Sequence, residues 1–383
     1  MRRLLLFLSA FGAVSCADAQ KIETMEHLRE RVLEVARVQA VYMDSLLPEG
    51  RCPRTFQGDT LVTSDIDWWC SGFYPGVLWM TDNTELAIKH TLPLAALLDH
   101  EIDHDIGFQL MSSFGNWNIL LYFTPDRDPE TVRMVGNVLR KGAEKLAERF
   151  NPATGVIRSW NGRRWNYPVI IDNMMNLELL MDYGDREIAE KHALTTAKNH
   201  FREDGTCFHL VDYAPDGSVL GKQTVQGFAD DSAWARGQAW ALYGYAMMAQ
   251  KEKENPELAK TFYNVAAKLE SWLLENLPED GVPYWDFSQT DYKDASAGAI
   301  IASGLLKMWR LRECPDDDPA LAMAERILRT LASPEYLAEP RTNGGFLLKH
   351  GVGHLPNRSE VDVPLTYADY YFLEALCLFP YED

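Results

Sequence analysis

The stretch SAWARGQAWALYGYAMMAQ, residues 232–250, decides the expected fold. After a polar opening it is apolar on nearly every helical face, and a helix of this kind is buried on all sides. The next helical stretch, residues 257–277, has one charged face and one apolar face, as expected for a helix at the surface. The two stretches together predict an inner helix followed by an outer helix.

The same pairing recurs along the whole chain. Inner helices are expected at residues 72–79, 105–113, 172–183, 232–250, 294–311 and 367–379. Outer helices are expected at residues 83–101, 129–150, 186–201, 257–277 and 318–331, with residues 23–46 closing the ring. This order predicts an all-α fold, an (α/α)6 barrel of six inner and six outer helices. Short strands such as residues 206–211 would form hairpins near the mouth. Periodicity alone leaves an α-solenoid as the alternative.

Composition narrows the class of protein. The chain has 383 residues, 46% of them hydrophobic, which is ample for a core. No low-complexity linker interrupts residues 20–383, so a single catalytic domain is expected. A formal net charge of −19 argues against a nucleic-acid partner, because phosphate binding requires a basic stripe. An anionic small substrate remains compatible if the pocket gathers cationic or hydrogen-bond donor groups.

The N-terminus has the pattern of a secretory signal peptide. Arg2 and Arg3 precede an apolar run over residues 4–14, and Ala17-Asp18-Ala19 is a cleavage-type sequence. The run is too short to span a bilayer. Residues 1–19 are therefore expected to be a signal peptide that directs the protein to the periplasm. Lipid attachment at Cys16 is the alternative, although Ala13 stands where such sites usually have leucine.

The remaining five cysteines are Cys52, Cys70, Cys207, Cys314 and Cys377. Their number is odd, and neither C-x-x-C pairs nor His/Cys clusters at metal spacing occur. Buried free thiols are favoured over a Cys52–Cys70 disulfide, which an oxidising compartment would permit. No metal site is expected.

Two aspartates are the candidate catalytic groups. Asp172 follows the apolar Val169-Ile170-Ile171, so burial should raise the pKa of its carboxyl, as a general acid requires near neutral pH. Asp105 also opens an inner helix. If the two meet across the mouth, their repulsion raises one pKa further. Helix N-capping is the alternative for each, and paired carboxylates are common to many glycosidases.

Aromatic and cationic residues complete the candidate pocket. Trp69, Trp160 and Trp240 are candidate platforms for sugar rings, which stack on indoles at little entropic cost. Arg236 lies at a helix start, where the helix dipole disfavours a cation, so it is expected to face an anionic or polar substrate group. His209 is a weaker candidate, with an ordinary core histidine as its alternative.

At these residues the chain resembles the unsaturated glucuronyl hydrolases of glycoside hydrolase family 88. The resemblance runs from about Asp67 to the C-terminus and rests on the order and spacing of several motifs. These are residues 69–76, 104–108, 170–172, 232–240, 282–287, 294–297 and 369–376. It implies an (α/α)6 barrel and an enzyme that hydrates the double bond of a 4,5-unsaturated uronic acid in lyase-generated oligosaccharides, with glycosaminoglycan fragments as the expected source. The hemiketal so formed rearranges and releases the sugar.

The resemblance also implies roles for individual residues. Asp172 would be the general acid and base, and Asp105 would orient the site. Trp69 and Trp160 would stack on the unsaturated ring, with neither metal nor nucleotide required. Substrate contacts are implied for His209, Gln226, Arg236 and Trp240.

Two segments bear on which sugar neighbours the unsaturated ring. Residues 224–227 read Thr-Val-Gln-Gly where some members have histidine before the glutamine. The loop at residues 350–364 resembles members acting on sulfated fragments, so Arg358 and Ser359 are candidate sulfate ligands. The alternative is that Arg358 and Ser359 are ordinary solvent-exposed loop residues.

Three other functions remain open from the residues alone. A polysaccharide lyase on the same barrel would need a tyrosine or histidine base. An inverting glycosidase would need a separated acid and base. A non-catalytic sugar-binding protein would keep the tryptophans but would have no reason to keep Asp172 in an apolar setting.

Overall fold

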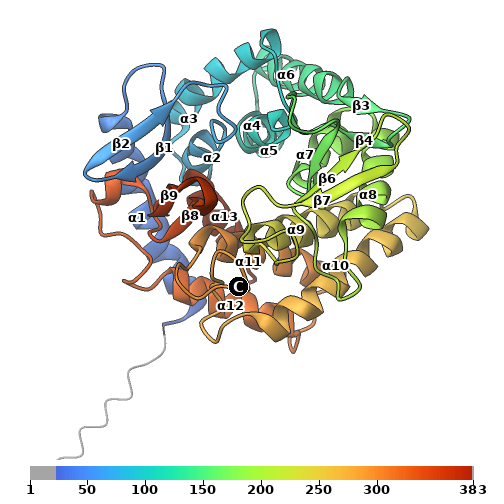
Figure 1. Cartoon of the computed structure of the whole chain (residues 1–383). Coiled ribbons are helices and arrows are strands. Elements are labelled where there is room, and N and C mark those ends of the chain that lie inside the picture. Colours follow the sequence, from blue (N-terminus) through green and yellow to red (C-terminus); the bar gives the residue numbers. More distant parts are fainter. Residues whose placement is uncertain (1–22, 382–383) are drawn as a thin grey trace, which may run out of the picture.

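The computed structural model describes residues 23–381 (Figure 1). The predicted signal peptide and Cys16 therefore lie outside the described residues. Within them, no helix combines the length and the apolar character needed to cross a membrane. The five cysteines of this part of the chain are all free thiols, and Cys70 and Cys207 are the buried ones.

Six inner helical segments surround the barrel axis. Most of their residues are buried, and α9 and α11 are buried over nearly their whole length. Each segment from α4 to α13 contacts the next, α13 returns to α2, and α2 contacts the helical turn that continues α4, so the ring closes (Figure 1). The segments are α2 (Phe73–Met80), α4 (Ile106–Leu110), α7 (Asn173–Tyr183), α9 (Ala235–Lys251), α11 (Ala295–Leu311) and α13 (Thr366–Leu378). The closed ring confirms the predicted (α/α)6 barrel and rules out the α-solenoid.

The outer helices begin with strong capping signals. Asp128, Asp185, Asn255 and Asp318 each accept a hydrogen bond from a backbone N–H of the first turn. Three of these helices also begin with proline, which has no N–H to leave unsatisfied. The outer helices are α1 (Met25–Leu46), α3 (Thr84–Thr91), α6 (Pro129–Ala147), α8 (Arg186–His200), α10 (Pro256–Asn276) and α12 (Pro319–Leu331).

Two predicted helices are not continuous. The second inner helix passes from α4 through a π-helical turn, Met111–Gly115, into α5 (Asn116–Phe123). In that region the hydroxyls of Ser112 and Ser113 donate to carbonyls of the preceding turn and compete with the regular helical bonds. The outer stretch at residues 83–101 changes after α3 to a 3₁₀ helix, Leu92–Asp99, where Pro93 cannot donate to the helical ladder.

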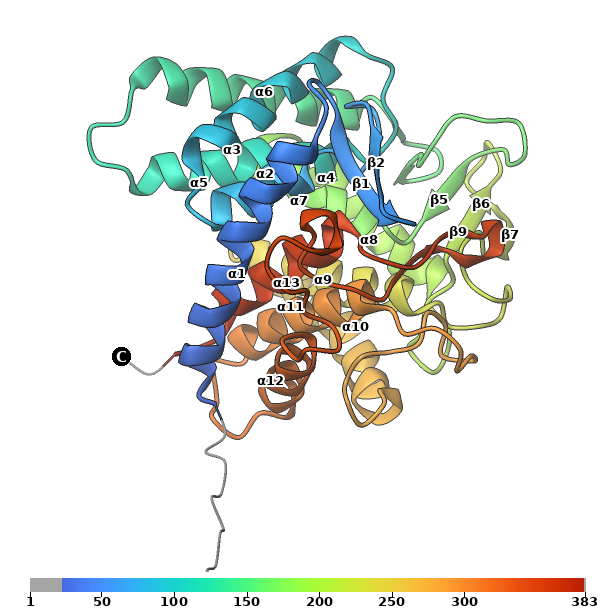
Figure 2. The same cartoon turned by 90° about the vertical axis from the view of Figure 1, so that its left-hand side faces the viewer.

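Short antiparallel strands gather at one end of the barrel, on the right in Figure 2. The predicted strand at residues 206–211 begins later, as β6, because Cys207 makes only an isolated bridge with Phe201. The strands are β1 (Cys52–Gln57), β2 (Thr60–Ser64), β3 (Phe150–Asn151), β4 (Val156–Ile157), β5 (Pro168–Ile170), β6 (Leu210–Tyr213), β7 (Val219–Gln223), β8 (Gly351–His354) and β9 (Ser359–Val363). Hairpins β1–β2 and β8–β9 contact each other and flank the cavity described next.

Candidate active site

A cavity of about 330 Å³ opens at this end of the barrel. Loops before the inner helices and the β8–β9 hairpin supply its walls. Its lining residues are Arg54, Trp68, Trp69, His104, Asp105, Trp160, Ile170, Asp172, Gln226, Arg236, Gly353, His354, Asn357, Ser359, Glu360 and Tyr367. The predicted residues Trp69, Asp105, Trp160, Asp172, Gln226, Arg236 and Ser359 are therefore brought together, whereas His209, Trp240 and Arg358 are not part of the lining.

The two candidate carboxyls occupy N-cap positions without capping. Asp105 precedes α4 and Asp172 precedes α7, and neither side chain accepts a hydrogen bond from its helix. Asp294, at the start of α11, does cap and accepts from the Ser296 N–H. The capping alternative therefore holds for Asp294 and not for the two aspartates that line the cavity.

A glycine allows the helices that carry these aspartates to approach closely. A Cβ on Gly107 would lie 2.5 Å from the Cα of Asn176, so only glycine fits between α4 and α7. The Asn176 side-chain oxygen also accepts a hydrogen bond from the Phe108 N–H at 2.8 Å. These contacts fix the start of α4 relative to α7, and hence Asp105 relative to Asp172.

Burial controls the protonation of Asp172. Its side chain is 11% exposed, and desolvation raises the pKa of the carboxyl to about 7. The Arg236 charge and the Trp240 indole oppose this rise. A carboxyl with this pKa exchanges a proton readily at neutral pH, as general acid–base catalysis requires.

A neutral histidine faces this carboxyl. Burial, followed by the Arg236 charge, lowers the pKa of His209 well below its usual value. Its Nδ1 accepts backbone N–H bonds from Val225 at 3.0 Å and Gln226 at 3.3 Å. Because Nδ1 is an acceptor, we assign the ring proton to Nε2, which lies 3.7 Å from Asp172 Oδ2. At this separation the two buried atoms make no hydrogen bond to each other or to any other described residue, and the uncharged His209 faces Asp172.

Asp105, like Asp172, lies near a buried histidine and has a raised pKa. Burial and the charges of Asp103 and Asp172 raise the pKa of the Asp105 carboxyl well above its usual value, against the attraction of Arg149. His104 Nε2 lies 3.4 Å from Asp105 Oδ1, and burial lowers the pKa of this histidine to about 3. The raised pKa favours the neutral form of the Asp105 carboxyl, beside a histidine that burial keeps uncharged.

Aromatic rings form the walls around the carboxyls. Trp69 packs edge-on against Phe73 and Phe108, and its centroid lies 4.7 Å from that of Tyr367. Trp160 packs against Trp165 at 5.6 Å on the neighbouring loop. Rings of this kind present faces on which a sugar can stack.

Comparison with known proteins gives the family. No family model matches the chain. An unsaturated glucuronyl hydrolase of Formosa agariphila is 39% identical over 329 residues, which cover 80% of this chain and 79% of that protein. The chain belongs to the unsaturated glucuronyl hydrolases. It is accordingly a glycoside hydrolase.

Solved structures of other unsaturated glucuronyl hydrolases agree with this fold. One, specific for heparin, superimposes with a TM-score of 0.85 at 37% identity, covering 92% of this chain and 97% of that one. A Streptococcus agalactiae enzyme, crystallised as a mutant complexed with dGlcA-GalNAc6S, gives a TM-score of 0.75 at 27% identity. That alignment covers 94% of this chain and 93% of that one.

We expected Arg236 to face a substrate group, but in this glucuronyl hydrolase its guanidinium donates hydrogen bonds to other groups of the protein. Its Nη1 donates to Asp294 Oδ2 at 3.0 Å and to the Val352 carbonyl. Its Nη2 donates to Gln226 Oε1 at 2.8 Å and to the Gly353 carbonyl at 2.6 Å. From the helix dipole we expected an anionic or polar substrate group at Arg236, whereas the anionic partner in the structure is Asp294. Arg236 thus fixes both Gln226 and strand β8 at the cavity.

The three predicted residues outside the lining lie in different places. Trp240 is fully buried, beneath Phe108 and beside Tyr371. His209 lies behind Asp172, as described above. Arg358 is exposed, with a left-handed backbone (φ 51°). Contact of these residues with substrate stays a prediction.

Sequence reasoning missed several lining residues in and beside the two hairpins. They include Arg54, Trp68, His354 and Glu360. Arg54 lies in β1, a strand that was not expected from the sequence, and its partner Glu360 is 306 residues away. The only local signal was a tryptophan pair at residues 68–69, of which only Trp69 was considered.

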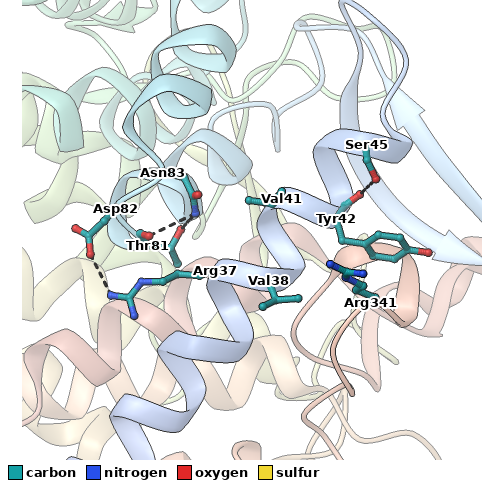
Figure 3. A pocket seen from close by; sticks show the side chains of 9 residues that line it. All are labelled: Arg37, Val38, Val41, Tyr42, Ser45, Thr81, Asp82, Asn83 and Arg341. Atoms are coloured by element: carbon teal, nitrogen blue, oxygen red, sulfur yellow. Dashed lines mark hydrogen bonds and ion pairs between the residues drawn. The ribbon is translucent and has the colours of Figure 1, made fainter.

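A larger cavity of about 650 Å³ lies elsewhere, beside the outer helix α1 (Figure 3). Val38, Val41 and Tyr42 line it, and Arg37 pairs with Asp82 at 3.0 Å. It contains no pair of buried carboxyls, so size does not make it the reactive site. Over residues 23–381, no cluster of His, Cys, Asp or Glu side chains could hold a metal ion.

Proposed function

We propose that the enzyme hydrates the 4,5 double bond of an unsaturated uronic acid at the non-reducing end of lyase-generated oligosaccharides. Glycosaminoglycan fragments are the proposed substrate class, supported by the heparin specificity of one relative and the dGlcA-GalNAc6S ligand of another. The observation that carries the proposal is Asp172, a buried carboxyl with a pKa of about 7 between aromatic walls.

In this reaction Asp172 acts twice. Its proton passes to C4 of the enol ether, which creates an oxocarbenium-like centre at C5. The resulting carboxylate then accepts a proton from the water that attacks C5. The product is a hemiketal, which opens and releases the neighbouring sugar. One carboxyl that changes protonation state near neutral pH suits both steps.

Other residues in and behind the cavity wall would support this cycle. Asp105, whose pKa is raised by burial and by the neighbouring carboxylates, would orient the site beside Asp172. Neutral His209 faces the Asp172 carboxyl without stabilising its charge as strongly as a cation would. Trp69 and Trp160 provide stacking surfaces for the unsaturated ring.

The test follows the fate of the double bond. The enzyme should abolish the ultraviolet absorbance of an unsaturated disaccharide and leave the saturated counterpart intact. In water that carries both deuterium and a heavy oxygen isotope, the deuterium should appear at C4 and the labelled oxygen at C5. Label at C1 together with cleavage of the saturated sugar would instead establish an inverting glycosidase, and new absorbance would establish a lyase.

We also propose that the protein is exported to the periplasm, with residues 1–19 as a cleaved signal peptide. The support is the sequence pattern of Arg2, Arg3 and the apolar run at residues 4–14. Cell fractionation and N-terminal sequencing test the proposal. A periplasmic protein beginning at Gln20 agrees with it, whereas a cytosolic protein that retains Met1, or an acylated Cys16, contradicts it.

A further inference from the structure

The charges that line the cavity pose a problem for an acidic substrate. Three carboxyl side chains, Asp105, Asp172 and Glu360, face the cavity, against two arginines, Arg54 and Arg236. Under the proposed function every substrate carries a uronate carboxylate. Binding an oxyanion in this setting requires a cation with uncommitted N–H donors.

Arg236 does not meet this requirement. Its four terminal N–H groups are matched by four protein acceptors: Asp294, Gln226 and the carbonyls of β8. The guanidinium is also only 2% exposed. Its charge acts on the cavity at a distance, but its hydrogen bonds are directed to the protein.

Arg54 meets the requirement. Its Nε donates to Glu360 Oε1 at 2.5 Å, which is its only side-chain hydrogen bond to the described part of the chain. Both terminal NH₂ groups therefore remain available as donors. The side chain is 25% exposed, so these donors can reach a ligand.

The Arg54 side chain is also held in place. Its guanidinium carbon lies over the Trp68 ring, 3.9 Å from the ring centroid, in a cation–π contact. Glu360, on the opposite hairpin, holds Nε and has a left-handed backbone (φ 56°). A planar guanidinium held in this way, with one edge bonded and the other free, is preorganised for a bidentate oxyanion.

We propose that Arg54 is a specificity-determining residue that binds an oxyanion of the substrate through its terminal NH₂ groups. Glu360 orients Arg54 and also opposes the ligand, because its carboxylate repels a second anion at the same guanidinium. The inference rests on the proposed function. The oxyanion has two possible sources, the carboxylate of the unsaturated uronate or a sulfate on the neighbouring sugar.

The variants that test this are Arg54→Gln, Arg54→Lys and Glu360→Gln. The control is Arg51→Ala, since within residues 23–381 the Arg51 side chain hydrogen-bonds only to Thr63 and does not line the cavity. Each is assayed for kcat/KM on one unsaturated disaccharide with and without sulfate. Binding of both sugars is measured in an Asp172→Asn background, and melting temperature is recorded throughout.

We expect Arg54→Gln to lower kcat/KM by about 10- to 100-fold, as for loss of a charge-assisted bond. Arg54→Lys should recover part of the loss, Glu360→Gln should bind the sugar more tightly than the parent, and Arg51→Ala should match the parent. A loss confined to the sulfated sugar identifies a sulfate as the ligand, and an equal loss on both sugars identifies the uronate carboxylate.

The inference is overturned if Arg54→Gln leaves both sugars unaffected. It is also overturned if Glu360→Gln reproduces the loss of Arg54→Gln, because Arg54 would then serve only to join the two hairpins. Failure of the proposed function is separate, because the parent enzyme would then leave the double bond of every unsaturated sugar intact.

Discussion

At the scale of single residues, Asp172 follows an apolar segment and occupies the N-cap position of α7 without accepting a capping hydrogen bond. We expect Asp172→Asn to fold normally and lose nearly all activity, because an amide cannot exchange the proton. In the parent, kcat/KM should fall as pH rises through about 7, since the carboxyl must enter the reaction protonated. A pH–rate series on an unsaturated disaccharide checks both statements. Turnover by Asp172→Asn close to that of the parent would remove Asp172 from the mechanism.

Arg236 gives a second prediction at this scale. Arg236→Ala leaves Asp294 buried without its cation, and breaking a buried pair in this way costs about 3–5 kcal/mol. We expect a large fall in the free energy of unfolding, measured by denaturant titration, together with lower activity because Gln226 and β8 lose their anchor. The double variant Arg236→Met with Asp294→Asn should recover much of the stability but little of the activity. Parent-like stability of Arg236→Ala would contradict the pairing.

Asp172 and Arg236 show which features of the site can be predicted from a short stretch of sequence and which cannot. The apolar segment before Asp172 is contiguous in sequence, so its desolvation could be predicted. The partners of Arg236 lie 58, 10, 116 and 117 positions away, and no spacing rule connects them. Arg54 was missed for the same reason, since its position depends on which hairpins meet at the mouth.

At the scale of helices and strands, the alternation of buried and charged helices predicted the order of the barrel. It could do so because helical amphipathicity is a property of each segment alone. The π turn at Met111–Gly115 was not predicted, since it arises where Ser112 and Ser113 compete for backbone carbonyls. The hairpins at the mouth are short and depend on pairing between segments, which leaves little periodic signal.

The close approach of α4 and α7 gives the prediction at this scale. Gly107→Ala places a Cβ 2.5 Å from the Asn176 backbone, so the helices must separate. We expect a loss of about 1–3 kcal/mol in stability. Activity should fall further than stability explains, because Asp105 moves relative to Asp172.

Gly136→Ala is the matched control, because its Cβ would meet no atom within 4 Å on the outer helix α6. That variant should be as stable as the parent or up to about 1 kcal/mol more stable, and fully active. Thermal unfolding and kcat/KM measured on both variants test the contrast. Equal behaviour of the two would show that the α4–α7 contact tolerates separation.

At the scale of the whole molecule, burial of the Asp172 carboxyl should lower the free energy of unfolding at neutral pH and above. Burial raises the pKa of Asp172 to about 7, whereas the unfolded chain loses this proton near the ordinary value of 3.8. Between these values the folded state holds a proton that the unfolded state has released. Stability from this group is therefore fully present below the unfolded pKa and is lost as pH rises through about 7.

Asp172→Asn removes this titration. The free energy of unfolding of the variant minus that of the parent should therefore rise from near zero at acidic pH to a plateau above neutral pH. The plateau is at most about 4 kcal/mol, the equivalent of the full pKa shift. Denaturant unfolding across the pH range measures it. Asp128 provides a control of opposite sign, because bonds from Thr131 lower its pKa and its contribution is lost toward acidic pH. If the Asp172→Asn curve runs parallel to that of the parent at every pH, Asp172 is not a carboxyl of raised pKa, and the single-carboxyl mechanism loses its physical basis.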